Sequence, residues 1–381
     1  MSEVSILIAG DYSPKERIQV AIDTKSYTHL FPGIKDVVQS VDYSIINFES
    51  TIPTIDSIPS EKIGSNLKTN EGALELLKFL GFDMLTMANN HIMDYGNSAL
   101  LNTIQKASVA GFDMVGVGDS LPEARAFKVI DIATNKIAIL NACENEFSIA
   151  TANSMGANPL DLINLSYDIK SAKERADFVI LIIHGGIEHY QLPSPRMKRW
   201  YQFLIDQGVD AIFNHHQHCY SGYEVYKGKP IFYGLGNFCF DSSSDIRLRH
   251  TTYNYGYMVK LNLSDSISFD IIPYEQCYNL PGVYLLNDHL FNEFKNNISY
   301  LNSIIADESK LREKFKEMAC KKRDFIYRGF YPFTGRIAYK LFSLGLIPSF
   351  LNKRRIQILN SILRCESHND ILQENFLEEH L

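Results

Sequence analysis

The histidines of this chain are concentrated in a few short segments. Six of the eleven lie in three segments, namely His91, His184, His189, His215, His216 and His218. One residue separates His216 from His218. In an extended chain alternate residues point to the same face, so both imidazoles would lie on one side. That arrangement is frequent among metal ligands. The pattern therefore indicates a metal site.

Other possible ligands follow short apolar runs that are typical of β-strands. The runs lie at residues 5–9, 43–46, 84–88, 178–183 and 211–213. The residues after them are, in the same order, Asp11, Glu49, Asn90 with His91, His184, and His216 with His218. Ligands of α/β proteins bind beyond the carboxyl ends of the strands. We therefore expect five strand ends to bring these side chains to one edge.

Each segment also has a purely structural explanation. An Asp after a strand usually caps a helix or forms a turn, and a histidine that ends an apolar run is usually a hydrogen-bonded core residue. The segment from His216 to His218 is harder to explain in that way. Because five segments share the pattern, we favour a metal site over five separate structural roles.

The types of the ligands restrict the metal. Only Cys219 lies in these segments, which argues against a structural zinc site made of thiolates. Imidazole, carboxylate and amide oxygen suit Mn²⁺, Fe²⁺ or Zn²⁺, as one ion or as two bridged by a carboxylate. Two ions about 3.5–4 Å apart generate a nucleophile from water and stabilise a tetrahedral transition state. We therefore predict one or two divalent ions as the cofactor.

The elements that position these residues alternate along the chain. Amphipathic helices are expected at residues 71–80, 97–110 and 195–207, and a glycine follows each one. Strands alternating with helices predict an α/β fold. After about residue 220, the strand-like runs 230–233, 255–263 and 267–273 are joined by short turns. This change predicts a second sheet of antiparallel character.

The length of the chain allows one large α/β domain and an appendage. We expect the catalytic domain at residues 1–280 and a helical C-terminal extension at 281–381. Basic clusters at 321–323 and 353–355 flank the apolar stretch 337–351. Such helices can lie on an anionic membrane surface, although we favour packing on the domain with a solvated basic face.

Composition excludes several classes of protein. The net charge of −7 gives no reason to expect nucleic acid as a partner. The six cysteines are scattered without a CxxC pair, which suits reduced thiols in the cytoplasm. The apolar run at residues 4–9 is too short for a signal peptide, and no run approaches the ~18 apolar residues of a membrane-spanning helix. We therefore expect a cytoplasmic protein that contacts a membrane, if at all, through its tail.

Four sequence blocks occur in order along the chain. They are MANNHIMDYG at residues 87–96, HGGIEHY at 184–190, NHHQHCYSG at 214–222 and GLGNFCFD at 234–241. Together they resemble the CapA family of capsule (poly-γ-glutamate) synthesis proteins, over residues 4–275. That resemblance implies the fold of calcineurin-like metallophosphatases, a two-sheet sandwich flanked by helices.

The resemblance also assigns roles. It implies one metal at Asp11, Glu49 and His218, and another at Glu49, Asn90, His184 and His216, with Glu49 as the bridge. His91 would be the general acid or would stabilise the transition state, and Asp94 would orient it. A carboxylate partner of this kind fixes the tautomer of a proton-donating histidine.

This chain departs from the pattern of those proteins at one ligand. Classical metallophosphatases carry a histidine where this chain has Ser13, so the metal site of Asp11, Glu49 and His218 lacks one imidazole. His215 or His189 could supply it. The other departures are Asn214 and Gln217 in place of Gly and Pro, and Gly185 in place of an aromatic residue.

Four residues near the strand ends are candidates for substrate binding, namely Glu188, His189, His215 and Asn237. A solvated loop explains the first two equally well, and Asn237 could instead bond to a loop that carries ligands. Asn141 and Glu144 follow the apolar run 137–140 and are further candidates for the same edge.

Two functions fit these features. The first is a metal-dependent hydrolase acting on a phosphoester, or on an amide of capsule or poly-γ-glutamate or another cell-envelope polymer. The second is a non-catalytic assembly factor that uses a degraded metal site to bind a polyanion. Ser13 favours the second function, whereas the intact group of Asn90, His91 and Asp94 favours the first. The expected partner is an anionic polymer or a phosphoester.

Overall fold

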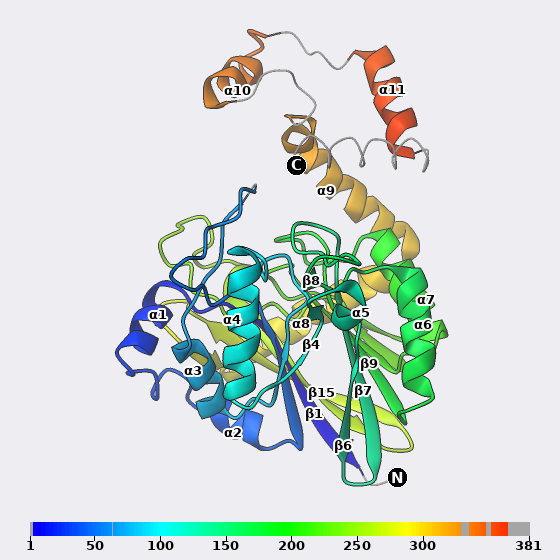
Figure 1. The fold of residues 1–381 in the computed structure, drawn as a ribbon. Coiled ribbons are helices and arrows are strands. Elements are labelled where there is room, and N and C mark those ends of the chain that lie inside the picture. The colour runs from blue at the N-terminus through cyan, green and yellow to red at the C-terminus, as the bar shows by residue number, and fades with distance from the viewer. Residues whose placement is uncertain (1–2, 63, 329–334, 348–351, 365–381) are drawn as a thin grey trace. The chain divides into compact units, whose positions relative to one another are not determined.

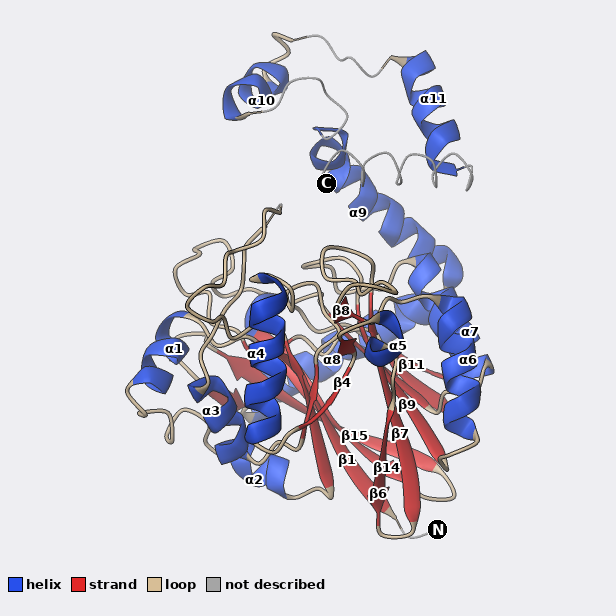
Figure 2. Ribbon diagram, viewed as in Figure 1, coloured by secondary structure: helices blue, strands red, loops and turns tan. Residues whose placement is uncertain are grey.

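Two β-sheets packed face to face form the larger part of the molecule (Figures 1 and 2). The computed structural model describes residues 3–62, 64–328, 335–347 and 352–364. The chain divides into two compact units, Met1–Arg312 and Glu313–Leu381, and each is described by itself.

The first sheet has the strand order β16-β15-β14-β1-β2-β3-β4. Its parallel part consists of β1 (Val4–Tyr12), β2 (Tyr43–Phe48), β3 (Met84–Thr86) and β4 (Asp113–Val115). Its antiparallel part consists of β14 (Tyr255–Leu263), β15 (Ile267–Gln276) and β16 (Val283–Leu285). The short strand β13 (Asn237–Cys239) also pairs with β1.

The second sheet has the order β11-β12-β10-β9-β7-β6. These strands are β6 (Lys128–Ile132), β7 (Asn135–Cys143), β9 (Phe178–His184), β10 (Ala211–His215), β11 (Tyr223–Tyr226) and β12 (Lys229–Phe232). All seven residues of β9 are buried, as expected of a central strand covered on both faces. A separate two-stranded sheet pairs β5 (Val117–Gly118) with β8 (Gly156–Ala157).

Helices cover the outer faces of both sheets (Figure 1). The first sheet carries α1 (Glu16–Asp23), α2 (Ile34–Gln39), α3 (Gly72–Leu80) and α4 (Gly96–Val109), and the second carries α6 (Leu162–Lys173) and α7 (Pro195–Asp206). The short helix α5 (Leu121–Ala124) precedes β6, and a 3₁₀ turn (Thr252–Asn254) precedes β14. One apolar core lies between the sheets and continues beneath α6 and α7, and another lies beneath α1–α4.

Local sequence explains how the helices begin and end. The Ser194 side chain accepts a hydrogen bond from the Met197 amide, and Pro195 occupies the first turn of α7, where its missing N–H costs nothing. Gly81 ends α3 with a φ of 103°, a left-handed conformation that glycine adopts without strain.

The predicted α/β fold with two sheets flanked by helices is confirmed. The five strands predicted before residue 220 are present as β1, β2, β3, β9 and β10. The prediction that the later strands form a second antiparallel sheet is wrong, because β14 pairs with β1 and β12 pairs with β10. The expected single edge is likewise made by two sheets, since β1–β3 belong to one and β9 and β10 to the other.

The larger unit continues past the expected boundary at residue 280. Helix α8 (Asp288–Ala306) buries its apolar residues in the core between the sheets and contacts β11. These residues are Phe294, Ile298, Leu301, Ile304 and Ile305. Whether residues 281–381 form a domain of their own stays a prediction.

The C-terminal residues are helical where they are described. The helices are α9 (Glu308–Arg328), α10 (Arg336–Ser343) and α11 (Lys353–Arg364). Residues 348–351 of the predicted apolar stretch, residues 365–381 of the predicted extension and Cys365 lie outside the described residues. Within the described part of the chain, no helix combines the length and the apolar character that crossing a membrane requires.

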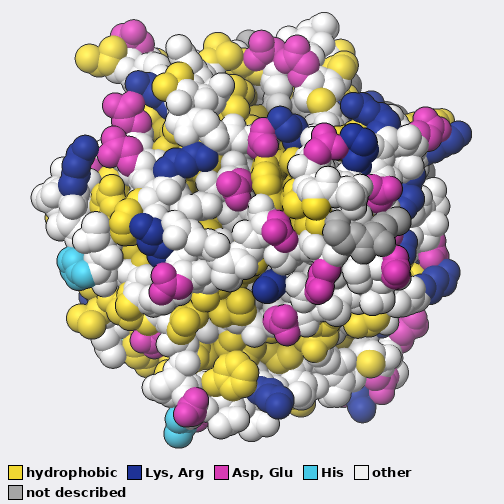
Figure 3. All heavy atoms as spheres, turned by 90° about the horizontal axis from the view of Figure 1, so that it is seen from below, with side chains coloured by type: hydrophobic (Ala, Val, Ile, Leu, Met, Phe, Trp, Pro, Cys, Tyr) yellow, Lys and Arg dark blue, Asp and Glu magenta, His cyan; other side chains and the backbone are white. Residues whose placement is uncertain are grey.

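The face of the molecule seen from below in Figure 3 carries both signs of charge. Acidic and basic side chains are interspersed with apolar ones on it. Whether nucleic acid is a partner stays a prediction from the net charge.

Candidate metal centre

Buried side chains from both sheets converge beyond the carboxyl ends of their strands. Two groups have ligand atoms within 4.8 Å of one another, one of Glu49, His184 and His216 and one of Asp11, Glu49 and His218. Asp11 belongs to β1, Glu49 follows β2 directly, His184 ends β9, and both other histidines follow β10. Glu49 is common to both groups, which is the arrangement expected of a bridging carboxylate.

Glu49 is the clearest sign that the centre takes a cation. Its side chain is fully buried, and neither carboxylate oxygen has a hydrogen-bond partner among the described residues. Burial and then the neighbouring Asp11 raise the pKa of Glu49 well above its ordinary value. An unpaired buried carboxylate is costly, and buried charges are normally paired or bound to metals. A bound cation would remove that cost.

Three imidazoles surround one oxygen of this carboxylate. Oε1 of Glu49 lies 3.6 Å from Nε2 of His184, 3.6 Å from Nε2 of His218 and 3.8 Å from Nε2 of His91. Burial holds the pKa of His184 well below its ordinary value and lowers that of His218 to about 4. Both rings are therefore neutral near pH 7, which is the form that binds a metal.

Asn90 lies beside the two histidines of the group that contains His184 and His216. Nε2 of His184 lies 3.0 Å from Oδ1 of Asn90 and 3.1 Å from Nδ1 of His216. The amide nitrogen of Asn90 donates to Glu146 at 2.9 Å, which turns its oxygen toward the histidines. Nε2 of His216 lies 3.8 Å from Glu146. One carboxylate from a loop therefore orients Asn90 and lies near His216.

Asp11 is held by both sheets. Its Oδ1 accepts a hydrogen bond from the Asn47 amide at 2.8 Å, and its Oδ2 accepts one from the backbone of His216 at 3.1 Å. Burial alone would raise the pKa of Asp11, but the neighbouring His215 outweighs it and lowers the pKa. Asp11 is therefore an anion at neutral pH, as a metal ligand must be.

The loop after β10 has a strained backbone. His216 and His218 have φ angles of 86° and 52°, in the left-handed region that residues other than glycine seldom adopt. Each such residue costs roughly 1–3 kcal/mol and persists where the surroundings fix it, typically at functional sites. Both side chains are buried, and the strained backbone makes this loop a candidate for a functional segment.

The ligand that the sequence lacks is also missing from the centre. Ser13 is fully buried, and its hydroxyl has no hydrogen-bond partner among the described residues. Neither His215 nor His189 joins the two metal-binding groups found among the described residues. The group of Asp11, Glu49 and His218 is thus left with one imidazole.

His91 and Asp94 form a close pair beside the centre. Nδ1 of His91 lies 2.6 Å from Oδ2 of Asp94, which also accepts from the Leu67 amide at 2.6 Å. Because Nδ1 is bonded to Asp94, Nε2 faces Glu49 and the ligands. Burial lowers the pKa of His91, although Asp94 opposes this shift.

The four predicted substrate residues fall into two pairs. Glu188 lies near the histidines, and although burial opposes it, the charges of His218 and His216 lower its pKa. The His189 ring lies 6.2 Å from that of His218 between ring centroids. These two residues therefore lie beside the predicted ligands, and their contact with substrate stays a prediction.

His215 and Asn237 lie behind the ligands instead. His215 is 1% exposed, with Nδ1 3.0 Å from Oδ1 of Asp11. Asn237 is fully buried, and its Oδ1 lies 2.9 Å from Nδ1 of His218. Burial favours a role in orienting ligands over contact with substrate for both, and substrate contact stays an untested prediction.

Sequence reasoning missed three residues of this centre. Asn47 links Asp11 to His184, whose Nδ1 lies 3.2 Å from the Asn47 amide nitrogen. Glu146 and Lys62 come from loops without any motif, and no local signal in the sequence distinguishes them. Asn47 could have been found, because it lies in the same strand-end segment as Glu49.

Asn141, which was predicted at the same edge, holds the loop after β3. Its side-chain oxygen accepts from the Met87 and Ala88 amides at 3.0 and 2.7 Å, and its nitrogen donates to the Ile182 carbonyl at 3.0 Å. It thereby ties the segment before Asn90 to the second sheet. Glu144 accepts from the Gly186 amide at 2.9 Å and from Arg196 at 2.5 Å.

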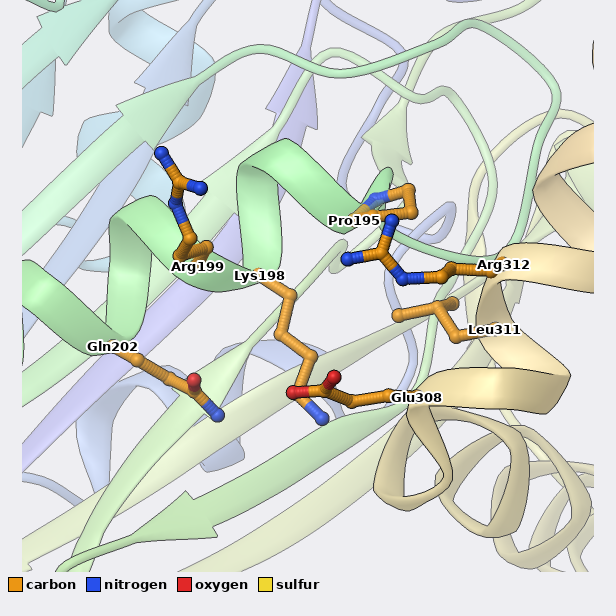
Figure 4. Close-up of a pocket in the computed structure, with 7 residues that line it drawn as sticks. All are labelled: Pro195, Lys198, Arg199, Gln202, Glu308, Leu311 and Arg312. Atoms are coloured by element: carbon orange, nitrogen blue, oxygen red, sulfur yellow. The ribbon is translucent and has the colours of Figure 1, made fainter.

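A small pocket elsewhere in the larger unit lies between α7 and the start of α9 (Figure 4). It has a volume of about 70 Å³ and is lined by Pro195, Lys198, Arg199, Gln202, Glu308, Leu311 and Arg312. The ammonium of Lys198 already donates to the Ile305 carbonyl at 2.6 Å and lies 3.6 Å from Glu224. Its buried cation is thus used internally, so the metal centre remains the stronger candidate site.

These features define a two-sheet α/β protein with a buried candidate metal centre between the sheet ends. Residues 5–242 match the family model described as bacterial capsule synthesis protein PGA_cap, and the chain belongs to this family. The PGA biosynthesis protein CapA of Bacillus subtilis (strain 168) is 30% identical over 242 residues, which cover 62% of this chain and 63% of that protein. The capsule biosynthesis protein CapA of Bacillus anthracis is 28% identical over 247 residues, covering 63% and 60%. The chain thus spans less than two thirds of the length of either relative.

Two solved structures are similar at low sequence identity. A hypothetical protein from Thermus thermophilus has a TM-score of 0.44 at 15% identity, covering 71% of this chain and 99% of that one. A candidate 5′-nucleotidase from Staphylococcus aureus, in complex with α-ketoglutarate, has a TM-score of 0.45 at 12% identity, covering 77% and 58%.

Proposed function

We propose that this protein is a metal-dependent hydrolase that cleaves a phosphoester or an amide in the metabolism of capsule, poly-γ-glutamate or another cell-envelope polymer. The observation that carries the proposal is the buried Glu49 carboxylate, which lacks hydrogen bonds among the described residues and is surrounded by imidazole nitrogens. Family membership supports the choice of polymer.

The residues of the centre fit one or two divalent ions. Glu49, Asn90, His184 and His216 would hold the first ion, and Asp11, Glu49 and His218 the second. Mixed imidazole, carboxylate and amide oxygen suits Mn²⁺, Fe²⁺ or Zn²⁺. Such ions activate water as a nucleophile and stabilise the negative charge of a tetrahedral or pentacoordinate transition state.

The protein itself supplies the proton for the leaving group. His91 directs Nε2 toward the centre, while its Nδ1 is bonded to Asp94. A histidine fixed in this way can protonate the leaving oxygen of an ester or the leaving nitrogen of an amide when it is in the imidazolium form, which carries a proton on Nε2 as well as on Nδ1. The Nε2 proton is the one transferred, and the neutral ring that remains keeps its Nδ1 proton on Asp94. Glu188 and His189 lie where they could contact the part of the substrate beyond the scissile bond.

The alternative function is a non-catalytic factor that binds a polyanion during capsule assembly. One observation favours it, namely that Ser13 leaves the group of Asp11, Glu49 and His218 with a single imidazole. A weakly filled second position would reduce catalysis without preventing binding. We place this function second, because the pair of His91 and Asp94 is intact.

We also propose that the C-terminal helices make peripheral contact with a membrane. Support comes from apolar residues of α10 that are exposed, such as Ile337 at 78%, together with the basic residues of α11. Helices that combine exposed apolar side chains with basic ones are typical of contact with an anionic lipid surface. Co-sedimentation of the full chain with vesicles containing phosphatidylglycerol tests this, and equal binding to neutral vesicles would argue against it.

The hydrolase proposal is tested on the full chain with added Mn²⁺. Bound metal is measured by elemental analysis, and hydrolysis of bis-p-nitrophenyl phosphate and of poly-γ-glutamate is followed. The variants are His216→Ala and His91→Ala, and the control is His289→Ala, which changes a histidine exposed on α8.

We expect the wild type and the control to bind metal and to hydrolyse at least one substrate. His216→Ala should lose metal and activity, whereas His91→Ala should keep the metal and lose activity. A wild type that binds metal but cleaves neither substrate would support the assembly factor instead. A wild type without metal would contradict both functions.

A further inference from the structure

We propose that Lys62 is a positioning residue of this centre, which fixes the pair of His91 and Asp94 so that His91 presents Nε2 to the leaving group. The inference rests on the proposed hydrolase function, and it adds a residue from outside the strand ends. Lys62 lies in the connection between β2 and α3, and its side chain is 3% exposed.

The contacts of the Lys62 ammonium all belong to one small region. It donates to Oδ1 of Asp94, lies 3.3 Å from Nδ1 of His91 and donates to the Asn90 carbonyl at 3.4 Å. It also lies 5.3 Å from the centre of the Phe147 ring, a distance at which a cation is attracted to an aromatic face. A buried lysine with this set of partners connects the predicted proton donor to a predicted metal ligand.

The two oxygens of Asp94 show why the lysine matters. Oδ2 is occupied by the Leu67 amide and by Nδ1 of His91, each at 2.6 Å. Oδ1 is bonded to Lys62. Asp94 is 1% exposed, and a buried carboxylate must have its charge paired and its lone pairs used. Without Lys62, the carboxylate would rotate or admit water, and the ring that it holds would lose its fixed orientation.

The chain around Lys62 indicates that the position is built rather than accidental. The Ser60 amide donates to the Asp94 carbonyl at 2.8 Å, and the Ser60 hydroxyl donates to the Met93 carbonyl at 2.8 Å. Bonds from Ser60 and from Leu67 thus hold the connection on either side of Lys62. This arrangement delivers the ammonium to Asp94 in a defined place.

The contact with His91 also has one consistent interpretation. Nδ1 is much closer to Asp94 than to Lys62, at 2.6 Å against 3.3 Å, so the Nδ1 proton is donated to the carboxylate. An ammonium cannot donate to a nitrogen that is itself a donor. Lys62 therefore acts on His91 through Asp94, and the role that follows is positioning rather than proton transfer.

The test compares two symmetric aryl phosphodiesters that differ only in the nitro groups on their rings, and therefore in how good their leaving group is. Bis-p-nitrophenyl phosphate has a good leaving group, whereas the diphenyl ester needs a proton donor more. We expect Lys62→Met to lower kcat for the diphenyl ester by about 10- to 100-fold, the range usual for residues that orient an active group. The loss with the p-nitrophenyl ester should be smaller, KM and bound Mn²⁺ should stay unchanged, and Lys62→Arg should recover most of the activity. Lys68→Met is the matched control, since Lys68 lies in the same connection between β2 and α3 but contacts the ring of Tyr95 instead.

A second readout does not depend on activity. In the zinc-loaded full chain, ¹⁵N-labelled at histidine, the Nδ1 proton of His91 should be visible by NMR, and His91→Ala assigns it. We expect Lys62→Met to lose this signal to exchange with water and Lys62→Arg to keep it. Because the ratio of the two ester rates is internal to each sample, a partly misfolded variant lowers both rates equally and leaves it unchanged.

An unchanged proton signal in Lys62→Met would overturn the positioning role, and so would equal losses with both esters. If the wild type cleaves neither ester, the hydrolase function fails, and the NMR result still decides whether Lys62 fixes His91. Lys62→Gln, which keeps a donor without the charge, takes the place of Lys62→Met if that variant does not fold.

Discussion

The two halves of the metal centre differ in how completely they are built. The half made of Glu49, Asn90, His184 and His216 has four possible ligands. In it, Nε2 of His184 lies 3.0 Å from Oδ1 of Asn90 and 3.1 Å from Nδ1 of His216. The half made of Asp11, Glu49 and His218 has three donors, and Ser13 stands where a fourth is expected.

The difference lies in one side chain and not in the backbone. The Ser13 amide still donates to the Cys239 carbonyl at 3.0 Å, and the Asp11 amide donates to the Gly236 carbonyl at 3.0 Å. The frame that would present an imidazole at this position is thus in place. The comparison teaches that the fold keeps the same backbone frame around both candidate groups, although one of them has lost an imidazole.

The largest expected effect is on Mn²⁺ binding, and it differs between the two halves when a histidine of each is removed. His216→Ala should weaken Mn²⁺ binding more than about 100-fold, because even residues that only orient ligands contribute about 10- to 100-fold. His218→Ala should leave the first ion bound and remove only the weaker one. Titration calorimetry on both variants measures this, with His289→Ala as the control. Equal losses of Mn²⁺ affinity in the two variants would show that the two halves do not differ.

A second effect concerns the stability of the metal-free protein. It depends on Glu49, which belongs to both halves. Its pKa is raised in the folded state by burial and by Asp11, so the folded chain holds its proton more tightly than the unfolded chain. Stability of the metal-free protein should therefore fall as the pH rises above about 4.5, the ordinary value.

Glu49→Gln should remove that loss of stability. We expect the variant to unfold at a higher temperature than the metal-free wild type at pH 7, although it binds no metal. A difference of 1 kcal/mol shifts Tm by about 2–4 °C in large domains, so thermal unfolding between pH 4 and 8 resolves it. A variant that is less stable than the wild type at pH 7 would show that Glu49 is paired in a way the structure does not contain.

A third change restores the missing imidazole. Ser13→His should raise the affinity for the second ion and bring the stoichiometry closer to two per chain. Ser13→Ala is the control, because it changes the same buried position without adding a ligand. Elemental analysis after dialysis against Mn²⁺ checks the result. A folded Ser13→His variant with unchanged stoichiometry would mean that the second half is incomplete for another reason.

The smallest effects should come from the residues that orient ligands. Asn237→Ala removes the partner of Nδ1 of His218 and should weaken the second ion by about 10-fold. Glu146→Ala releases Asn90 and should instead weaken the first ion by a similar factor. A competition assay with Zn²⁺ measures both affinities. If Asn237→Ala weakened the first ion, or Glu146→Ala the second, the two halves would not be independently supported.

The sequence predicted most of the residues that the structure brings together in the two candidate groups, because their signal is local. Asp11, Glu49 and His184 each follow a short apolar run within a few residues, and a strand end fixes where such a side chain emerges. The pairing of the strands could not be predicted in this way. Val4 lies opposite Leu263 in the first sheet, and nothing near either residue identifies its distant partner.

The supporting residues were out of reach for a related reason. Lys62 and Glu146 lie in irregular loops, and their contacts with Asp94 and Asn90 depend on the path of the whole connection. Asn237 was noticed, but its burial behind His218 follows from the pairing of β13 with β1. Residues defined by tertiary contact alone leave no periodic pattern to read.

The central claim is that Glu49 holds a metal ion, and the most direct measurement is the manganese content of the full chain. Wild type and Glu49→Gln are dialysed against the same Mn²⁺ solution at neutral pH and compared by elemental analysis. We predict at least one ion per wild-type chain and none in Glu49→Gln. Equal manganese in both proteins, or none in the wild type, would contradict the claim.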